Sequence, residues 1–388
     1  MPKYDMLADW PFDLKALPSP CFLVDEAKLE ANCQILDRVQ REAGVTVILA
    51  LKGYATFATF PLIRRFLGGT TASSLNEALL GAEQFGGEVH IYAPAFRDDE
   101  FGKILETTDH ISFNTLSQWQ YFKDKVMAHP KAHSCGLRVN PEHVEVEVDI
   151  YNPCCRYSRL GTTRTELNPA FLEGLEGLHV HALCQSSAEE FSRMLGTFER
   201  KFGGFLKQMK WLNLGGGHHI TRPDYNVELL ISELKRIRET YGVKVYLEPG
   251  EAVALNAGIL VSSVLDLMHN EVDIAILDCS ASTHMPDVIE MPYRPHIIDS
   301  DMPGKKTHTY KLGGQTCLAG DIVGDYSFDE PLSIGDKLVF LDMAIYSMVK
   351  TTTFNGVNLP SIAVGDSRSG EYRVVRNFGY EDYKSRLS

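Results

Sequence analysis

Apolar runs typical of β-strands recur at regular intervals over residues 47–248, and helical patterns such as 188–209 and 227–241 lie between most of them. The eight runs lie at 47–51, around Thr70, and at 89–93, 110–114, 135–140, 178–183, 211–214 and 243–248. Such alternation favours right-handed crossovers and a parallel sheet. Eight strand–helix units predict a closed (β/α)8 barrel in the α/β class.

Polar residues and glycine stand at the C-terminal ends of several of these runs. They are Lys52, Asn140, His181, Gly215 and Glu248. Barrel enzymes carry their chemistry at this rim, where the carboxyl ends of all strands meet. The sequence therefore predicts an active site built from these residues.

Lys52 directly follows an apolar strand and directly precedes Gly53. Burying an ammonium group is costly, so such a lysine either reaches solvent or has a chemical partner. The simpler interpretation is a strand-end lysine that extends to water. The alternative is a Schiff-base lysine whose amine is partly neutral and nucleophilic.

The triple glycine Gly215, Gly216 and Gly217 follows another strand. Successive glycines let backbone amides approach an anion such as a phosphate, although tight turns contain similar runs. Glu248 ends the eighth strand and is suited to hold a proton on a pyridine nitrogen, or to form a loop salt bridge. With Lys52, these features predict a pyridoxal phosphate site.

Two histidines, His179 and His181, flank Val180 in one strand. We expect them to face opposite sides, one the barrel interior and the other the helices, which disfavours a shared metal ion. His218 and His219 add two imidazoles, but no acidic ligand lies at a recognisable spacing. We therefore expect no catalytic metal, and interpret His181 as stacking on an aromatic cofactor or as a hydrogen-bonded core histidine.

Beyond Gly250, strand-like runs separated by turns predominate, at 259–267, 272–277, 307–312, 337–341 and 372–375. They predict a mostly antiparallel β domain. We expect a cofactor-binding barrel over 25–258, and a β domain of 1–24 with 259–388. In that domain Cys317 lies in a glycine-rich loop, and Tyr346 follows it in the sequence. Taken alone, a cysteine in such a place is more often a small buried side chain than a catalytic group. Taken alone, Tyr346 would usually be a core or interface aromatic.

The composition narrows the function classes. The formal net charge is -13 and no Lys/Arg run occurs, which disfavours a nucleic-acid or anionic-membrane partner. Residues 1–17 lack a signal-peptide pattern, and no apolar segment reaches the ~18 to 20 residues that span a bilayer. The eight cysteines form no CxxC pair, which favours reduced thiols in the cytoplasm over disulfides or structural zinc.

Over nearly its whole length the chain resembles the fold-type III pyridoxal phosphate decarboxylases, which include ornithine, arginine and diaminopimelate decarboxylases. Within them it is most similar to the carboxynorspermidine/carboxyspermidine decarboxylases. The motifs that carry the resemblance are ALKGY (50–54), ASSLNE (72–77), LRVNP (137–141), SRLG (158–161), GLHVHALCQ (177–185), LNLGGGH (212–218), LEPGE (247–251), GGQTCLAGD (313–321), DMAIY (342–346) and FNG (354–356), together with residues 282–295.

The resemblance implies an alanine racemase-like barrel with a C-terminal β domain that contributes to the active site and the dimer interface. It implies that Lys52 binds pyridoxal 5'-phosphate covalently and that His181 stacks on its ring. It assigns the ring nitrogen to Glu248, and the phosphate to Gly215, Gly216, Gly217 and the Tyr346 hydroxyl. In a head-to-tail homodimer, Cys317 would enter the neighbouring subunit's site and help to reprotonate the product carbanion.

The chain departs from ornithine-type enzymes at four positions. Glu251 stands where they have arginine, Cys184 where they have serine, Thr71 where they often have aspartate, and Leu318 where they have an acid. The acid that usually binds a distal amine is therefore absent. Because unpaired buried ammonium groups are costly, other acids must serve a polyamine, and the candidates are Glu251, Asp287 and, more weakly, Glu290.

The implied reaction is decarboxylation of carboxynorspermidine or carboxyspermidine to norspermidine or spermidine and CO2, in polyamine biosynthesis. A diaminopimelate or other basic amino acid decarboxylase is the nearest alternative, and Arg294 is a candidate to hold a distal carboxylate. A racemase would need a second base opposite Lys52. A non-catalytic relative is disfavoured because Lys52, His181, Glu248 and Cys317 are all retained.

Overall fold

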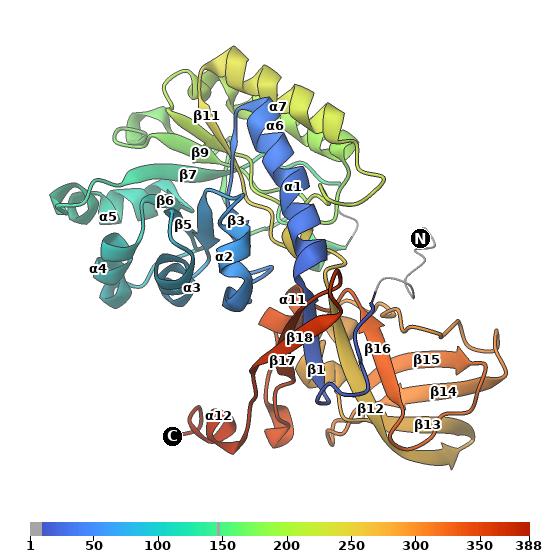
Figure 1. Ribbon diagram of the computed structural model, residues 1–388. Coiled ribbons are helices and arrows are strands. Elements are labelled where there is room, and N and C mark those ends of the chain that lie inside the picture. The colour runs from blue at the N-terminus through green and yellow to red at the C-terminus, as the bar shows by residue number, and fades with distance from the viewer. Residues whose placement is uncertain (1–9, 146–147) are drawn as a thin grey trace. The chain divides into compact units, whose positions relative to one another are not determined.

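The computed structural model describes residues 10–145 and 148–388 (Figure 1). The described residues form two compact units, one within residues 31–253 and one that combines residues 10–30 with residues 254–388. Residues 1–9 of the predicted 1–24 segment lie outside the described residues. Within the described part of the chain, no helix is both long and apolar enough to cross a lipid bilayer.

Residues 31–253 form a closed parallel barrel. Its first strand is split around Ile48 into β2 and β3; β2 pairs with β11 and β3 pairs with β4, so the sheet closes on itself. The strands are β2 (Thr46–Val47), β3 (Leu49–Ala50), β4 (Gly69–Ala72), β5 (Glu88–Tyr92), β6 (His110–Phe113), β7 (Ser134–Asn140), β9 (Gly177–His179), β10 (Trp211–Asn213) and β11 (Lys244–Leu247), and β8 (Thr162–Thr163) pairs with β7 outside the ring. With β2 and β3 counted as one strand, the predicted (β/α)8 barrel is confirmed.

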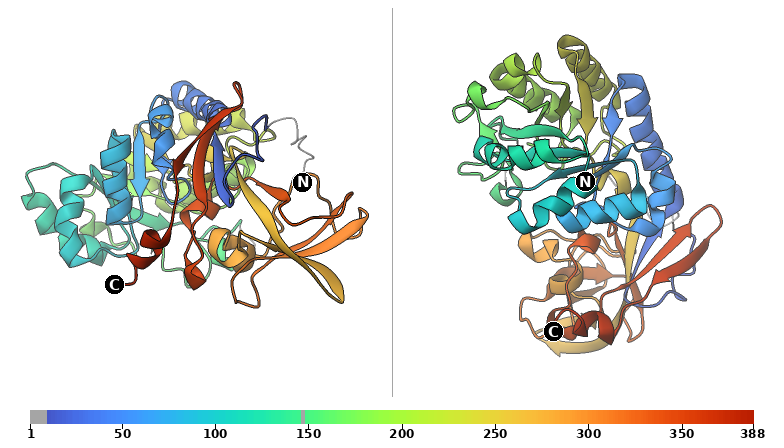
Figure 2. Two further views of the ribbon diagram at one scale, coloured as in Figure 1. Left: turned by 60° about the horizontal axis from the view of Figure 1, so that its bottom comes forward. Right: turned by 90° about the vertical axis from the view of Figure 1, so that its left-hand side faces the viewer.

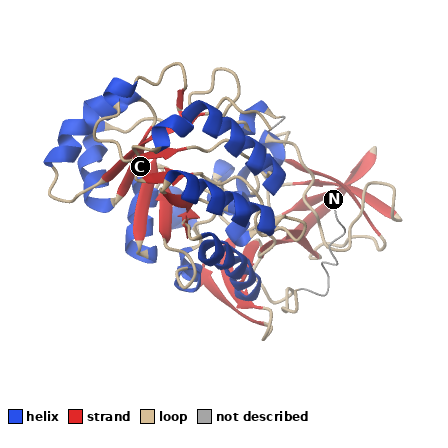
Figure 3. Cartoon of the chain, turned by 90° about the horizontal axis from the view of Figure 1, so that it is seen from above, coloured by secondary structure: helices blue, strands red, loops and turns tan. Residues whose placement is uncertain are grey.

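Helices run along the outside of the barrel strands (Figure 3). They are α1 (Glu26–Ala43), η1 (Phe57–Thr59), α2 (Phe60–Ile63), α3 (Leu75–Leu80), the π-helical turn η2 (Gly81–Phe85), α4 (Asp98–Thr107), α5 (Leu116–Ala128), α6 (Ala188–Leu206), α7 (Val227–Tyr241) and α8 (Glu251–Ala254). Between β7 and β9, the helical segments of the described residues are the short turns η3 (Asp149–Tyr151) and η4 (Pro169–Phe171).

Helix α6 shows why these segments are helical. Ser187 accepts a hydrogen bond from the Glu190 N–H, and the Glu190 side chain accepts one from the Ser187 N–H, so two N-terminal amides are satisfied. The helix buries Phe191, Phe198 and Phe202 at helical spacing. Local capping and the apolar face therefore agree, as the sequence pattern predicts.

The second unit contains an eight-stranded sheet (Figures 1 and 2), with β1 in blue and the other strands in yellow to red. Only the pairs β1–β17 and β13–β14 are parallel, so the predicted mostly antiparallel sheet is confirmed. The strands are β1 (Cys21–Asp25), β12 (Gly258–Asn270), β13 (Val272–Leu277), β14 (His308–Gly313), β15 (Ile322–Phe328), β16 (Lys337–Leu341), β17 (Ser361–Asp366) and β18 (Glu371–Arg376). Its short helices are α9 (Ala281–His284), α10 (Asp287–Glu290), α11 (Tyr346–Val349), η5 (Phe354–Gly356) and α12 (Tyr380–Lys384).

Both faces of this sheet are buried at its centre. Phe22 and Leu260 belong to one hydrophobic cluster, whereas Leu23, Ile259 and Val261 belong to a second. Neighbouring residues on a strand point to opposite faces, so β1 and β12 contribute to both clusters. This explains why β1 is apolar almost throughout.

Trp211 fills the N-terminal end of the barrel over two glycines. A Cβ on Gly177 would lie 2.0 Å from the Trp211 ring, and a Cβ on Gly136 would lie 2.3 Å from it. The Trp211 Nε1–H donates to the Ser134 hydroxyl at 2.8 Å, which fixes the indole. Glycine at these positions is therefore a packing requirement of the barrel.

We predict that Gly177→Ala destabilises the protein by roughly 1 to 3 kcal/mol, because the new methyl group overlaps a fixed ring. The matched control is Gly102→Ala in α4, where a Cβ would meet no atom within 4 Å. Its higher helix propensity should raise the stability by about 0.5 to 1 kcal/mol. Urea unfolding followed by circular dichroism measures both changes, and equal midpoints for the two variants would contradict the packing argument.

Candidate active site

A pocket opens at the C-terminal rim of the barrel. It is lined by Ala50, Lys52, Thr71, Ala72, Ser73, Tyr92, Arg138, His179, His181 and Glu248. Three of the predicted site residues, Lys52, His181 and Glu248, therefore lie together. Tyr92 and Arg138 were missed, although both lie near the C-terminal ends of their strands, β5 and β7.

Lys52 lies in the turn after β3, where the Gly53 N–H donates to the Ala50 carbonyl oxygen at 3.0 Å. A Cβ on Gly53 would lie 2.9 Å from the Gly250 Cα, so this turn requires glycine where it packs against the chain after β11. Protein atoms crowd the Lys52 ammonium, and this burial, followed by the charge of Arg138, lowers its pKa, while Glu248 opposes the change. The side chain is nevertheless exposed, because the pocket around it is open.

Arg138 is a buried cation beside Lys52. Its guanidinium lies 4.3 Å from the centre of the Tyr92 ring, and its Nη2 donates to the His181 carbonyl oxygen at 3.1 Å. The Tyr92 hydroxyl in turn donates to Asn114 Oδ1 at 2.8 Å. The aromatic face and the carbonyl oxygen hold the arginine in place, so its positive charge is a fixed part of the pocket.

His181 is held by the glycine run. The Gly216 N–H donates to His181 Nδ1 at 3.1 Å, which leaves the proton of a neutral ring on Nε2. Burial, and then the charges of Lys52 and Arg138, hold the pKa of His181 well below its usual range. The ring is therefore neutral near pH 7, which suits it to stack on an aromatic cofactor.

The expectation that His179 and His181 face opposite sides is wrong. Both line the same pocket, because residues two apart on an extended strand share a face. His179 is 2% exposed, and neither ring nitrogen has a hydrogen-bond partner among the described residues. Burial lowers its pKa to about 4. Its Nε2 lies 3.6 Å from Glu248 Oε2, too far for a hydrogen bond, so His179 and the Glu248 carboxylate face each other in the pocket.

Glu248 is tied to the glycine run through Asn213. The Asn213 Nδ2 donates to Glu248 Oε1 at 2.6 Å, and Asn213 Oδ1 accepts the Gly215 N–H at 2.8 Å. Burial raises the pKa of Glu248, but the attraction of His179 and the Asn213 hydrogen bond outweigh it, so the pKa is lowered overall. The carboxylate is therefore ionised and fixed in the pocket.

The triple glycine is required by close packing. A Cβ on Gly216 would lie 2.2 Å from the Glu248 carbonyl oxygen, and one on Gly217 would lie 1.9 Å from the Leu183 carbonyl oxygen. Gly215 and Gly217 also have φ of +65° and +85°. The amides of Gly215 and Gly216 already donate to Asn213 and His181, so the phosphate role of this run stays a prediction.

Glu251, the first residue of α8, has two polar partners in the barrel unit. His219 Nε2 lies 3.2 Å from Glu251 Oε1, and the Gln185 Nε2 donates to the same oxygen at 3.1 Å. The residue is partly buried. It is therefore a positioned carboxylate whose partners are not strong cations.

The remaining predicted residues belong to the second unit. Cys317 is exposed, and its N–H donates to Asn355 Oδ1 at 2.8 Å. Tyr346 is the first residue of α11. Asp287 forms an ion pair with Lys350, and the same ammonium also pairs with Glu290.

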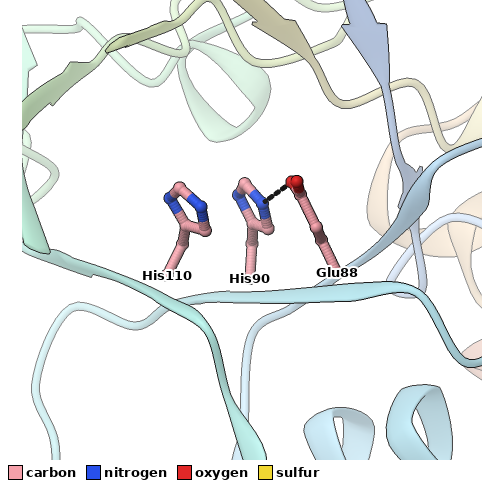
Figure 4. A group of neighbouring side chains, drawn as sticks. All are labelled: Glu88, His90 and His110. Carbon is pink, nitrogen blue, oxygen red and sulfur yellow. Dashed lines mark hydrogen bonds and ion pairs between the residues drawn. The ribbon is translucent and has the colours of Figure 1, made fainter. Parts of the chain in front are cut away.

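A second polar cluster lies at the N-terminal ends of β5 and β6 (Figure 4). Within residues 10–145 and 148–388, Glu88, His90 and His110 are the group whose possible ligand atoms all lie within 4.8 Å of one another. The two rings are stacked 4.1 Å apart at 9°, so their planes cannot both contain one ion, as imidazole ligation requires. Lys244 Nζ also lies 2.9 Å from Glu88 Oε1, where it competes with a metal.

The known proteins to which this chain is similar agree with the chemistry of the pocket residues. Residues 21–344 match the family model described as pyridoxal-dependent decarboxylase, C-terminal sheet domain. The carboxyaminopropylagmatine decarboxylase of Synechocystis sp. is 46% identical over 376 residues, which cover 96% of each chain. The carboxynorspermidine/carboxyspermidine decarboxylase of Campylobacter jejuni is 44% identical over 381 residues, covering 95% of this chain and 98% of that one.

A solved structure has the same architecture. The crystal structure of the Campylobacter jejuni carboxynorspermidine decarboxylase complexed with norspermidine has a TM-score of 0.88 at 43% identity, covering 95% of this chain and 100% of that one. The family match covers most of the chain, and the relatives are similar over nearly their full lengths. The chain therefore belongs to the family of pyridoxal-dependent decarboxylases.

Proposed function

We propose that the protein decarboxylates a carboxylated polyamine, carboxynorspermidine or carboxyspermidine, and releases CO2 with norspermidine or spermidine. The observation that carries the proposal is the pocket in which Lys52, His181 and Glu248 lie together. Similarity to the Campylobacter jejuni enzyme, whose solved structure is described as a complex with norspermidine, supports the polyamine class.

The pocket residues fit pyridoxal phosphate. A lysine with a lowered pKa offers a nucleophilic amine, a fixed carboxylate faces the same space, and neither His179 nitrogen has a hydrogen bond among the described residues. The cofactor supplies an electron sink that stabilises negative charge at the substrate's α-carbon. Lys52 would hold it, Glu248 would keep its ring nitrogen protonated, and His181 would lie on its face.

The chain's own groups divide the remaining work. The neutral fraction of Lys52 would be the nucleophile that holds the cofactor. The neutral His181 ring adds no charge beside the electron sink. The thiol of Cys317 would deliver a proton to the α-carbon after CO2 leaves. In a homodimer, this thiol would come from the neighbouring subunit, which its exposure in the single chain supports.

Substrate ammonium groups need carboxylates, and we assign this role to Glu251 and Asp287. Among the described residues, the partners of Glu251 are a histidine and an amide, and neither is a lysine or arginine that would neutralise its charge. Asp287 and Glu290 already share the Lys350 ammonium, so the group of three carries one net negative charge. That arrangement can still attract a cationic chain.

Arg294, the candidate for a diaminopimelate carboxylate, is engaged elsewhere. Its Nε donates to the Asp325 carbonyl oxygen at 3.1 Å, and its Nη2 donates to the Asp301 carbonyl oxygen at 2.6 Å. The guanidinium also lies 3.8 Å from the centre of the Tyr326 ring. These contacts use two of the five N–H groups of the guanidinium and fix it on the Tyr326 ring, so a distal carboxylate could meet only the other three.

Carboxyaminopropylagmatine is a second candidate substrate, because the Synechocystis sp. relative that carries this name is 46% identical. It too is a carboxylated amine with a cationic end, so the same chemistry at Lys52 would apply. We also propose that the enzyme works in the cytoplasm, which its eight free cysteines support.

We predict that purified, cofactor-loaded protein releases CO2 from carboxynorspermidine, carboxyspermidine or carboxyaminopropylagmatine with a kcat/KM roughly 100-fold or more above that for diaminopimelate, ornithine, arginine and lysine. The two carboxy-polyamines differ by one methylene group, so their ranking should span only about 10- to 200-fold. Preference for diaminopimelate would overturn the assignment of the substrate.

We predict that Glu248→Gln lowers kcat by roughly 100-fold or more, because an amide cannot stabilise a protonated ring nitrogen. Cofactor absorbance should persist, since Lys52 is unchanged. The matched control is Glu199→Gln, which removes a partly buried carboxylate that pairs with Arg236 in the same unit. A Glu248→Gln enzyme with the kcat of the control would refute the assignment of Glu248 to the ring nitrogen.

We predict that Glu251→Gln and Asp287→Asn each raise KM for the polyamine substrate by about tenfold, as expected for one lost charge-assisted hydrogen bond. Cofactor binding, measured by titration of absorbance, should stay within about twofold of wild type. Asp325→Asn serves as the control, because Asp325 forms a comparable ion pair with Lys311. The assignment fails if both variants keep the wild-type kcat/KM.

A further inference from the structure

The loop that carries Cys317 ends at a buried carboxylate, Asp321, which is 3% exposed. The Ser280 hydroxyl lies 2.9 Å and 2.8 Å from its two oxygens, and the Thr316 hydroxyl donates to Oδ2 at 2.6 Å. Backbone N–H groups of Ser282 and Thr316 donate to Oδ1 and Oδ2, each at 3.2 Å. Asp321 thus links both ends of the Cys317 loop to the start of α9.

The loop also closes on itself around Asp321. The Gly314 N–H donates to the Asp321 carbonyl oxygen, and the Asp321 N–H donates to the Leu318 carbonyl oxygen, both at 2.9 Å. A Cβ on Gly314 would lie 2.3 Å from Asp321 Oδ2, so glycine lets the backbone approach the carboxylate. The loop backbone therefore closes at Asp321, and the carboxylate packs closely against it.

The anchor to which Asp321 binds is itself rigid. Ser280 is fully buried and caps α9, where its Oγ accepts the Thr283 N–H at 3.2 Å. The Ser280 N–H donates to the buried His284 Nδ1 at 3.2 Å. A side chain bonded to such a platform transfers that rigidity to the loop.

Cys317 has little packing of its own. It is exposed, and the hydrogen bond of its N–H to Asn355 Oδ1 is a backbone contact. Its thiol position is therefore set by the loop that Asp321 and Asn355 hold at two points. A proton donor must lie within hydrogen-bond reach of the atom it protonates, so this placement matters for the reaction.

The chemistry of the contacts favours a carboxylate at this position. All the described donors to Asp321 are hydroxyl or backbone N–H groups, and none is a cation. A carboxylate accepts at both oxygens, whereas an amide would direct its own N–H groups at some of these donors. Burying a carboxylate without a neighbouring cation is costly. We therefore expect such a carboxylate at a position where the protein needs the specific geometry of its hydrogen bonds.

We propose that Asp321 is a positioning residue that holds the Cys317 loop so that the thiol can protonate the decarboxylated carbon. This inference rests on the proposed role of Cys317. It assigns to Asp321 an effect that acts through Cys317 and not through the stability of the unit as a whole.

A double-mutant cycle tests this coupling in the cofactor-loaded enzyme. Cys317→Ser and Asp321→Asn should each lower kcat by about tenfold or more, with KM changed by less than about twofold. The double variant should be no slower than Cys317→Ser alone, within about twofold, because the thiol that Asp321 positions is already absent. Multiplicative losses in kcat would overturn the proposal while leaving the role of Cys317 intact.

The matched control is Asp25→Asn, since Asp25 is another fully buried carboxylate of the same unit. Its Oδ1 accepts the N–H groups of Ala27 and Ser367, both at 3.0 Å. Its effect on kcat should be the same, within about twofold, in the wild-type and Cys317→Ser backgrounds. If Asp25→Asn lowered kcat in wild type but not in Cys317→Ser, as expected for Asp321→Asn, the cycle would report general destabilisation. That result would overturn the proposal.

Hydrogen exchange separates this inference from the proposed function. The amides of residues 314–321 should exchange at least about tenfold faster in Asp321→Asn than in wild type. In Asp25→Asn, their exchange rates should equal those of wild type. Unaltered exchange in Asp321→Asn would overturn the loop-positioning role whatever the activity. If wild type released no CO2 from any carboxylated polyamine while the exchange changed as expected, the proposed function would fail and the structural coupling would stand.

Discussion

The direction of the strands in the closed parallel barrel is the constraint on which the rest of the site depends. Pairing of β2 with β11 and of β3 with β4 closes the sheet at one split strand, and the turn that follows it carries Lys52. Because every carboxyl end points to one rim, residues from distant parts of the sequence meet there. Glu248, nearly 200 residues away, lines the same pocket as Lys52.

The pocket balances charges of both signs around the lysine. Arg138 disfavours the protonated amine, while Glu248 favours it, and burial favours the neutral form. Asn213 and the glycine run connect the Glu248 carboxylate to the His181 ring by hydrogen bonds. Several site groups are therefore positioned by one another, so a change at one of them should alter the geometry of its neighbours.

Sequence patterns predicted much of this arrangement, because strand and helix periods and strand ends are local properties. The barrel, the mostly antiparallel sheet and the meeting of Lys52, His181 and Glu248 follow from them. The strands β15 (Ile322–Phe328) and β17 (Ser361–Asp366) were not predicted, because glycine and aspartate interrupt the apolar run of β15 and the apolar run of β17 is short. Hydrogen bonds such as those of Asp321 depend on contacts between segments that no single pattern encodes.

The central claim is that Lys52 carries the cofactor in the barrel pocket. Borohydride reduction of the cofactor-loaded protein, followed by proteolysis and peptide mass spectrometry, tests it most directly. Reduction makes a lysine Schiff base permanent, so the structure predicts that the cofactor's added mass is found on the peptide that contains Lys52. Addition at a different lysine, or a protein that binds the cofactor without any covalent addition, would contradict the claim.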